Sequence, residues 1–118
     1  MRNLGYYNGT IGLIEEMKVP MMDRGFYFGD GIYDAAYSRN HIIYALDEHI
    51  NRFYAGLARM EIAQPMPREQ LRELLIDLVR KVDDGEQFVY WQATRGSALR
   101  DHAFPPHDVP SNLAVMLR

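Results

Sequence analysis

The chain has 118 residues and a mass of 13.7 kDa, which suits a single domain. Its composition, 47% hydrophobic and 25% charged, is that of a globular protein, and the absence of cysteine excludes a disulfide scaffold, a thiolate metal site and a cysteine nucleophile. A net charge of −3 disfavours a nucleic-acid partner, and the sequence has no signal segment and no apolar run of about 20 residues, so we expect a cytoplasmic protein without a membrane partner.

The N-terminal third is expected to supply mainly strands. Residues 6–15 predict a short hairpin, because an Asn-Gly pair is a preferred two-residue turn. Residues 19–31 look irregular. Residues 32–38 alternate as a strand, and a turn then leads into a further strand over residues 41–45.

Two helices are predicted next, separated by two prolines. Asp47 is the predicted N-cap of a helix that runs to about residue 62. Its apolar residues recur at helical spacing and should face the core: Ile50, Phe53, Leu57 and Met60. The second helix, over residues 68–82, carries one apolar stripe: Leu71, Leu74, Leu75, Leu78, Val79 and Val82.

The remaining segments complete the fold prediction. Residues 88–94 and 111–118 read as strands, and residues 95–110 form a loop long enough to suggest a function. Strands followed by two helices and then strands predict an α+β domain. We expect one domain over residues 1–118.

One stretch, "DRGFYFGDGIYD" at residues 23–34, combines three glycines, four aromatic rings and four charged residues. Its spacing fits neither a phosphate-binding glycine loop nor a calcium-binding loop. From the residues alone, a tight turn into the following strand explains the glycines, because glycine tolerates positive φ and close backbone contact.

Four segments in series resemble the class IV (fold type IV) aminotransferases, which use pyridoxal phosphate, and most of all the D-amino acid (D-alanine) aminotransferases. They are "DRGFYFGDGIYD", "LDEHINRFYAGLARMEI", "FVYWQATRG" and "LRDHAFP". The resemblance implies the small N-terminal domain of these enzymes, a mostly antiparallel sheet of about six strands with two helices packed on it. It also implies amino acid and 2-oxo acid substrates and a homodimer. In that setting the glycines would let the chain pass close to the active site, and the rings would line it.

The resemblance assigns roles to four residues that look ordinary by themselves. Arg52 would otherwise be a surface charge on the first helix, but the family places its phosphate-binding arginine there, and a guanidinium matches phosphate oxygens well. Tyr33 would otherwise be a core tyrosine; in the family its hydroxyl points toward the substrate carboxylate. Arg100 and His102 match an R-x-H pair that grips this carboxylate across the dimer interface. Arg95 we interpret as structural.

The family's chemistry also needs a lysine that forms a Schiff base with the cofactor and an acidic partner for the pyridine nitrogen. Lys18 and Lys81 are the only lysines here, and neither matches a family motif. Both missing groups belong to a second, C-terminal domain in the family. We therefore expect the N-terminal domain of a longer enzyme, without a catalytic residue or a metal site of its own.

Other readings remain open at this point. Within the family, a branched-chain aminotransferase or a 4-amino-4-deoxychorismate lyase is possible, although the R-x-H pair favours D-amino acids. A non-catalytic α+β binding module would also explain the lack of a family-position lysine. Four motifs in the family's order favour the enzyme.

Overall fold

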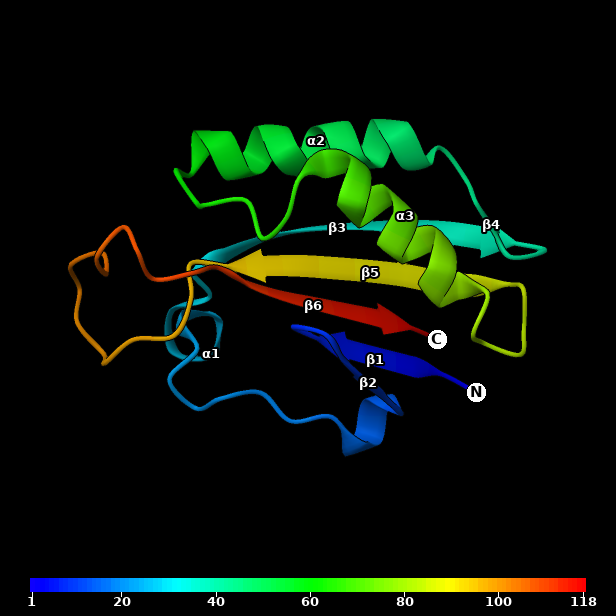
Figure 1. Ribbon diagram of the computed structural model, residues 1–118, viewed down its shortest axis with the longest axis horizontal. Helices are drawn as coiled ribbons and strands as arrows, with labels where there is room; N and C mark the ends of the chain where they lie inside the picture. Colours follow the sequence, from blue (N-terminus) through cyan, green and yellow to red (C-terminus); the bar gives the residue numbers. More distant parts are fainter.

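The computed structural model describes all 118 residues, and its centre is one six-stranded antiparallel sheet (Figure 1). The strands lie in the order β2-β1-β6-β5-β3-β4, and every neighbouring pair is antiparallel. Their bounds are β1 Leu4–Tyr7, β2 Thr10–Gly12, β3 Gly31–Arg39, β4 Ile42–Ile43, β5 Gln87–Thr94 and β6 Asn112–Leu117.

Two long helices, α2 (Leu46–Arg59) and α3 (Arg68–Val79), cover the same face of the sheet (Figure 1). A 3-10 turn (Ile14–Glu16) and a five-residue helix, α1 (Arg24–Phe28), complete the element list. The predicted α+β class, with two helices packed on about six antiparallel strands, is confirmed.

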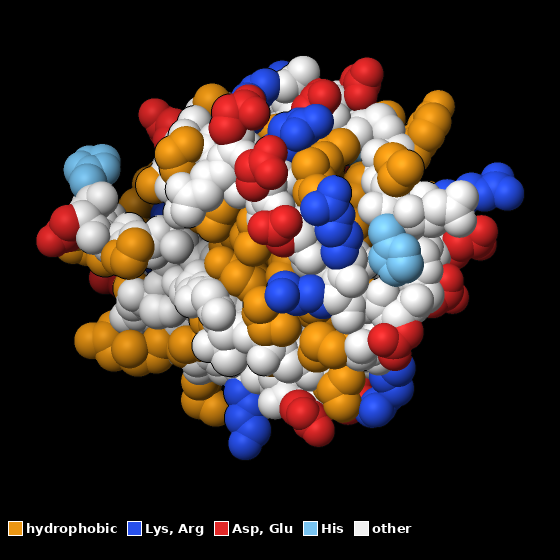
Figure 2. Space-filling view, turned by 45° about the vertical axis from the view of Figure 1, so that its right-hand side comes forward, with side chains coloured by type: hydrophobic (Ala, Val, Ile, Leu, Met, Phe, Trp, Pro, Cys, Tyr) orange, Lys and Arg blue, Asp and Glu red, His pale blue; other side chains and the backbone are white.

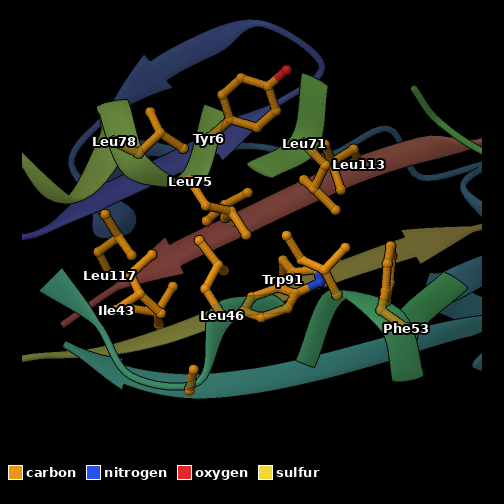
Figure 3. Packing of buried hydrophobic residues seen from close by; sticks show 14 of the residues in the cluster. Tyr6, Ile43, Leu46, Phe53, Leu71, Leu75, Leu78, Trp91, Leu113 and Leu117 are labelled. Atoms are coloured by element: carbon orange, nitrogen blue, oxygen red, sulfur yellow. The ribbon is translucent and has the colours of Figure 1, made fainter. Parts of the chain in front are cut away.

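The core lies between the two helices and the sheet. Strand alternation turns every second residue of β5 toward the helices, so Val89, Trp91 and Ala93 are fully buried. Figure 3 shows the leucines of α3 above β6 and Phe53 of α2 beside Trp91, whose ring centroid is 6.2 Å away. Burying one such large apolar side chain contributes about 1.5–3 kcal/mol, so this layer holds the helices on the sheet.

Several predicted boundaries were wrong. The N-cap of α2 is Ala45, in the left-handed conformation, and Asp47 instead forms an ion pair with Arg72 of α3. Met60 is 46% exposed because α2 ends at Arg59, one turn earlier than predicted. Helix α3 ends at Val79, although the buried stripe continues to residue 82.

The segment predicted to be irregular contains α1. Asp23 caps this helix by accepting a hydrogen bond from the Gly25 amide, and Gly29 ends it at φ +62°. At Gly31 a Cβ would lie 2.6 Å from the carbonyl oxygen of Ala93 on β5. These two glycines are therefore explained by the turn and by contact with the neighbouring strand.

The other face of the sheet has no helix over most of its area and exposes apolar side chains, among them Tyr33, Tyr37 and Met116. On the face drawn in Figure 2, acidic and basic side chains are mixed, without a large area of one sign. No helix has the length and apolar character needed to cross a membrane.

Candidate functional site

The first feature of the site is a buried carboxylate beneath an exposed arginine. Strand alternation places Asp34 of β3 on the helix-covered face, where its side chain is only 2% exposed. Arg52 of α2 donates to both oxygens, from Nε to Oδ2 and from Nη2 to Oδ1, each at 2.8 Å. His49 lies one turn earlier on the same helix face, and its Nδ1 is 2.8 Å from Oδ1.

The arrangement holds Arg52 while leaving much of it free. Its side chain is 70% exposed, and its Nη1 group makes no hydrogen bond within the chain. Because the pair is bidentate, the guanidinium plane is fixed and the remaining N–H groups point away from Asp34. A fixed fork of exposed N–H donors is what an oxyanion such as phosphate requires.

The charges within this cluster stabilise one another. Burial by itself raises the pKa of the Asp34 carboxyl, but hydrogen bonds from Arg52, His49 and the Ala35 amide outweigh it and hold the pKa below its usual value. Hydrogen bonding to Asp34 raises the pKa of Arg52. The pair is therefore fully ionised at neutral pH.

Stability should consequently fall in acid. The Asp34 and Asp30 carboxyls titrate near pH 3.9 in an unfolded chain, and their folded pKa values are lower. Groups of this kind stabilise the fold above the unfolded pKa, and that contribution is lost as the pH falls through the folded pKa. We expect the free energy of unfolding, measured by urea titration, to drop as the pH falls below about 4.

The substitution Asp34→Asn should make this drop smaller, because it removes one of the two carboxyls whose pKa is lowered in the folded chain. Asp47→Asn is the matched control, since Asp47 is an exposed carboxylate that also pairs with an arginine. An equally steep drop in Asp34→Asn and in the wild type would show that the Asp34 cluster does not contribute to acid stability.

Tyr33 lies next to this cluster in sequence but on the opposite face of the sheet. It is exposed rather than in the core, and it stacks on Tyr90 of β5 with ring centroids 5.4 Å apart. From Gly31 to Ala36, β3 pairs only with β5, because β4 pairs with Ser38 and Arg39 and the Tyr44 amide donates to the Tyr37 carbonyl. A ligand at this open strand edge could therefore reach both Tyr33 and Arg52.

Arg100 and His102 lie in the loop formed by residues 97–111, which extends past the end of the sheet beside α1 (Figure 1). Both are exposed. The Arg100 guanidinium lies 5.0 Å from the centroid of the Phe28 ring, and the His102 ring lies 5.9 Å from it. The structure thus brings the R-x-H pair together around one ring, and no hydrogen bond or ring contact joins either residue to Tyr33.

Arg95 is structural, as interpreted from the sequence, and its contacts now give the reason. Its Nη1 and Nη2 groups donate to the carbonyls of Glu61 and Met60 at the end of α2, at 2.9 and 3.0 Å. Its Nε donates to Asp30. Arg95 directly follows the last residue of β5 and therefore ties the end of α2 to that strand.

The sequence reading missed Asp34, and a signal for it was present. In the predicted strand, Asp34 shares a face with Ala36 and Ser38, which should be buried. A carboxylate on a buried face needs a cationic partner, and His49 and Arg52 lie on one face of the next helix.

A separate hollow of about 350 Å³ lies on the uncovered face of the sheet, between β1, β6 and the segment that leads to α1. Its one charged residue, Asp23, is already bonded to Tyr7, Asn112 and the Gly25 amide. This hollow contains none of the residues that the sequence assigned to the site.

Comparison of the sequence with known proteins finds relatives of one family. The family model described as amino-transferase class IV matches residues 31–118. The D-alanine aminotransferase of Listeria monocytogenes serotype 1/2a is 39% identical over 92 residues, which cover 77% of this chain and 32% of that protein. The D-alanine aminotransferase of Bacillus licheniformis is 37% identical over 102 residues, covering 83% and 35%. The chain thus spans about a third of the length of these curated relatives.

Solved structures share the fold at lower identity. The branched-chain amino acid aminotransferase of Escherichia coli matches with a TM-score of 0.86 at 15% identity, over 100% of this chain and 41% of that one. The 4-amino-4-deoxychorismate lyase of Pseudomonas aeruginosa matches with a TM-score of 0.78 at 23% identity, over 95% and 38%.

Proposed function

This chain belongs to the class IV aminotransferases, and we propose that it is the N-terminal domain of an enzyme that moves an amino group between a D-amino acid of the D-alanine type and a 2-oxo acid. The cofactor in this proposal is pyridoxal phosphate. The partner is a second copy of the enzyme, in a homodimer.

The observation that carries the proposal is the exposed guanidinium of Arg52, held in place by the buried Asp34. Pairing a surface arginine with a carboxylate that is only 2% exposed adds little to the stability of the fold, because the buried carboxylate loses its hydration. The same arrangement is useful if the free side of the guanidinium must meet an anion at a fixed angle.

The donor set fits the phosphate of pyridoxal phosphate. Arg52 would hold that phosphate through Nη1 and the remaining hydrogen of Nη2. When bound, the cofactor supplies an electron sink for bond changes at the α-carbon of an amino acid. The chain's own part is then to fix the cofactor's phosphate and to orient the amino acid.

Tyr33, Arg100 and His102 would orient the amino acid by its α-carboxylate. A hydroxyl, a guanidinium and an imidazole are three donors suited to one carboxylate. Within one chain Arg100 and His102 surround Phe28 and do not contact Tyr33. This supports an arrangement in which the loop of a neighbouring subunit completes the grip on the substrate.

The relatives named D-alanine aminotransferase, at 32–39% identity, favour D-amino acids over the branched-chain and lyase alternatives. The test is an assay of the purified protein that carries this chain, with D-alanine and 2-oxoglutarate, and with L-leucine as the competing donor. We expect turnover of D-alanine. A preference for L-leucine would replace the proposal with the branched-chain alternative.

The 118-residue chain by itself should give no turnover in the same assay. Its two lysines, Lys18 and Lys81, are both exposed, and neither is bonded to the cluster of Asp34, Arg52 and His49. Catalysis needs an amine held at the cofactor. Measurable transfer of the amino group by the isolated chain would contradict the proposal that the catalytic lysine lies in a second domain.

A further inference from the structure

A buried group of three charged side chains, which the proposed function does not use, lies at the end of the sheet. Oδ2 of Asp30 accepts hydrogen bonds from Nε of Arg24 at 2.8 Å and from Nε of Arg95 at 2.9 Å. The side chains of Arg24, Arg95 and Asp30 are only 4%, 8% and 11% exposed. One carboxylate thus stands between two buried guanidinium groups, and removing it would leave both cations without a counter-charge.

Each of these arginines also reaches the loop of residues 97–111. Nη1 of Arg24 donates to the carbonyl oxygens of Asp101 and Ala103, at 3.1 and 3.4 Å. These carbonyls belong to the residues directly before and after His102. The guanidinium of Arg95 lies 3.9 Å from the centroid of the Phe104 ring, two residues further along the same loop.

Phe28, the last residue of α1, holds the side chains of the loop. Arg100 and His102 both lie against its ring, and Arg24 lies 4.9 Å from the ring centroid. Cation–π contact with an aromatic face restrains an arginine without using its N–H donors. The donors of Arg100 therefore stay available for a ligand.

The loop has little internal structure to hold it otherwise. Two hydrogen bonds close turns within it, from the Ala103 amide to the Asp101 side chain and from the Val109 amide to the Pro106 carbonyl. Its residues from Leu99 to Phe104 are all exposed. The order of the loop at His102 is supplied from outside, by Arg24 and Phe28.

We propose that Asp30 and Phe28 are positioning residues for the substrate-carboxylate grip. Asp30 fixes Arg24, which holds the loop backbone on both sides of His102, and Arg95, which lies against the Phe104 ring, while Phe28 fixes the side chains of Arg100 and His102. This inference rests on the proposed function for the role of the R-x-H pair. A prepositioned grip loses less conformational freedom when it binds, so loosening it should weaken substrate capture.

The first measurement does not depend on activity. Amide hydrogen exchange over residues 97–111 is compared in the wild-type protein, Asp30→Asn, Asp30→Glu and Phe28→Leu, with Asp47→Asn as the surface carboxylate control. We expect exchange to be about ten- to a hundredfold faster in Asp30→Asn and Phe28→Leu, with partial recovery in Asp30→Glu. Exchange around Arg52 should not change. Should Asp30→Asn fail to fold, Phe28→Leu decides, because its ring is only partly buried.

The second measurement is kinetic, on the purified protein that carries this chain. We expect KM for D-alanine to rise about tenfold in Asp30→Asn and Phe28→Leu, with a smaller change in kcat and an unchanged dissociation constant for pyridoxal phosphate. Unchanged exchange in both variants overturns the positioning role. Faster exchange with an unchanged KM overturns its link to the substrate. A wild type without aminotransferase activity overturns the proposed function, while the exchange comparison still decides whether these residues order the loop.

Discussion

Replacing Arg100 with alanine is expected to lower kcat/KM for D-alanine about thirty- to a thousandfold in the enzyme that carries this chain. A clamp on the α-carboxylate decides which face of the amino acid meets the cofactor, and so which enantiomer reacts. In the proposed clamp, the charged donors of Arg100 would contribute most, because hydrogen bonds between ions are stronger than neutral ones. Positioning of this kind is realised most fully in the transition state.

The measurement is steady-state kinetics with D-alanine and L-alanine. Arg39→Ala is the control, since Arg39 is an exposed arginine whose Nε is 3.8 Å from Glu86, away from the loop. His102→Ala should have a smaller effect than Arg100→Ala, because a neutral imidazole donates one hydrogen bond without a charge. An unchanged kcat/KM for D-alanine in Arg100→Ala, or a wild type that prefers L-alanine, would contradict both the carboxylate clamp and the proposed specificity for D-amino acids.

Arg52→Ala is expected to weaken pyridoxal phosphate binding about ten- to a hundredfold, with a much smaller effect on the KM of the amino acid. Arg52→Lys should recover only part of this affinity, because an ammonium group lacks the planar fork that meets Asp34 and a phosphate together. The dissociation constant is measured by titration with the cofactor.

Arg72→Ala provides the matched control for Arg52→Ala. Arg72 also donates from Nε to an aspartate, Asp47, but both partners lie on the outer surface of the helices. Equal cofactor affinity in Arg52→Ala, Arg72→Ala and the wild type would show that Arg52 is an ordinary surface charge and would remove the cofactor assignment.

These two variants test two separate places in the fold. Arg52 lies above the helix-facing side of β3, and the R-x-H loop lies past the end of the sheet beside α1. Independent effects on cofactor binding and on substrate selection are therefore expected. Sites with no shared partner usually act additively.

The strands and the long helices could be predicted from local pattern. Alternation revealed β3, β5 and β6, and helical spacing revealed the buried face of α3, because one buried face imposes a period of 2 or 3.6 on the sequence. The helix α1 was not predicted from the sequence. It is five residues long, and its capping and tertiary contacts involve Asp23, Gly29 and the 97–111 loop, so a periodicity window could not detect it.

Sequence patterns were enough to predict the fold class, the resemblance to the family through four motifs, and the candidate residues Tyr33, Arg52, Arg100 and His102. The supporting contacts are visible only in the folded chain: Asp34 under Arg52, Phe28 between Arg100 and His102, and Asp30 between Arg24 and Arg95. These contacts join residues from 6 to 74 positions apart in the chain, and all of them except the Arg24–Asp30 contact span at least 18 positions. A local sequence pattern can indicate that a buried polar residue needs a partner. Which residue becomes that partner depends on how the sheet, the helices and the loop pack together.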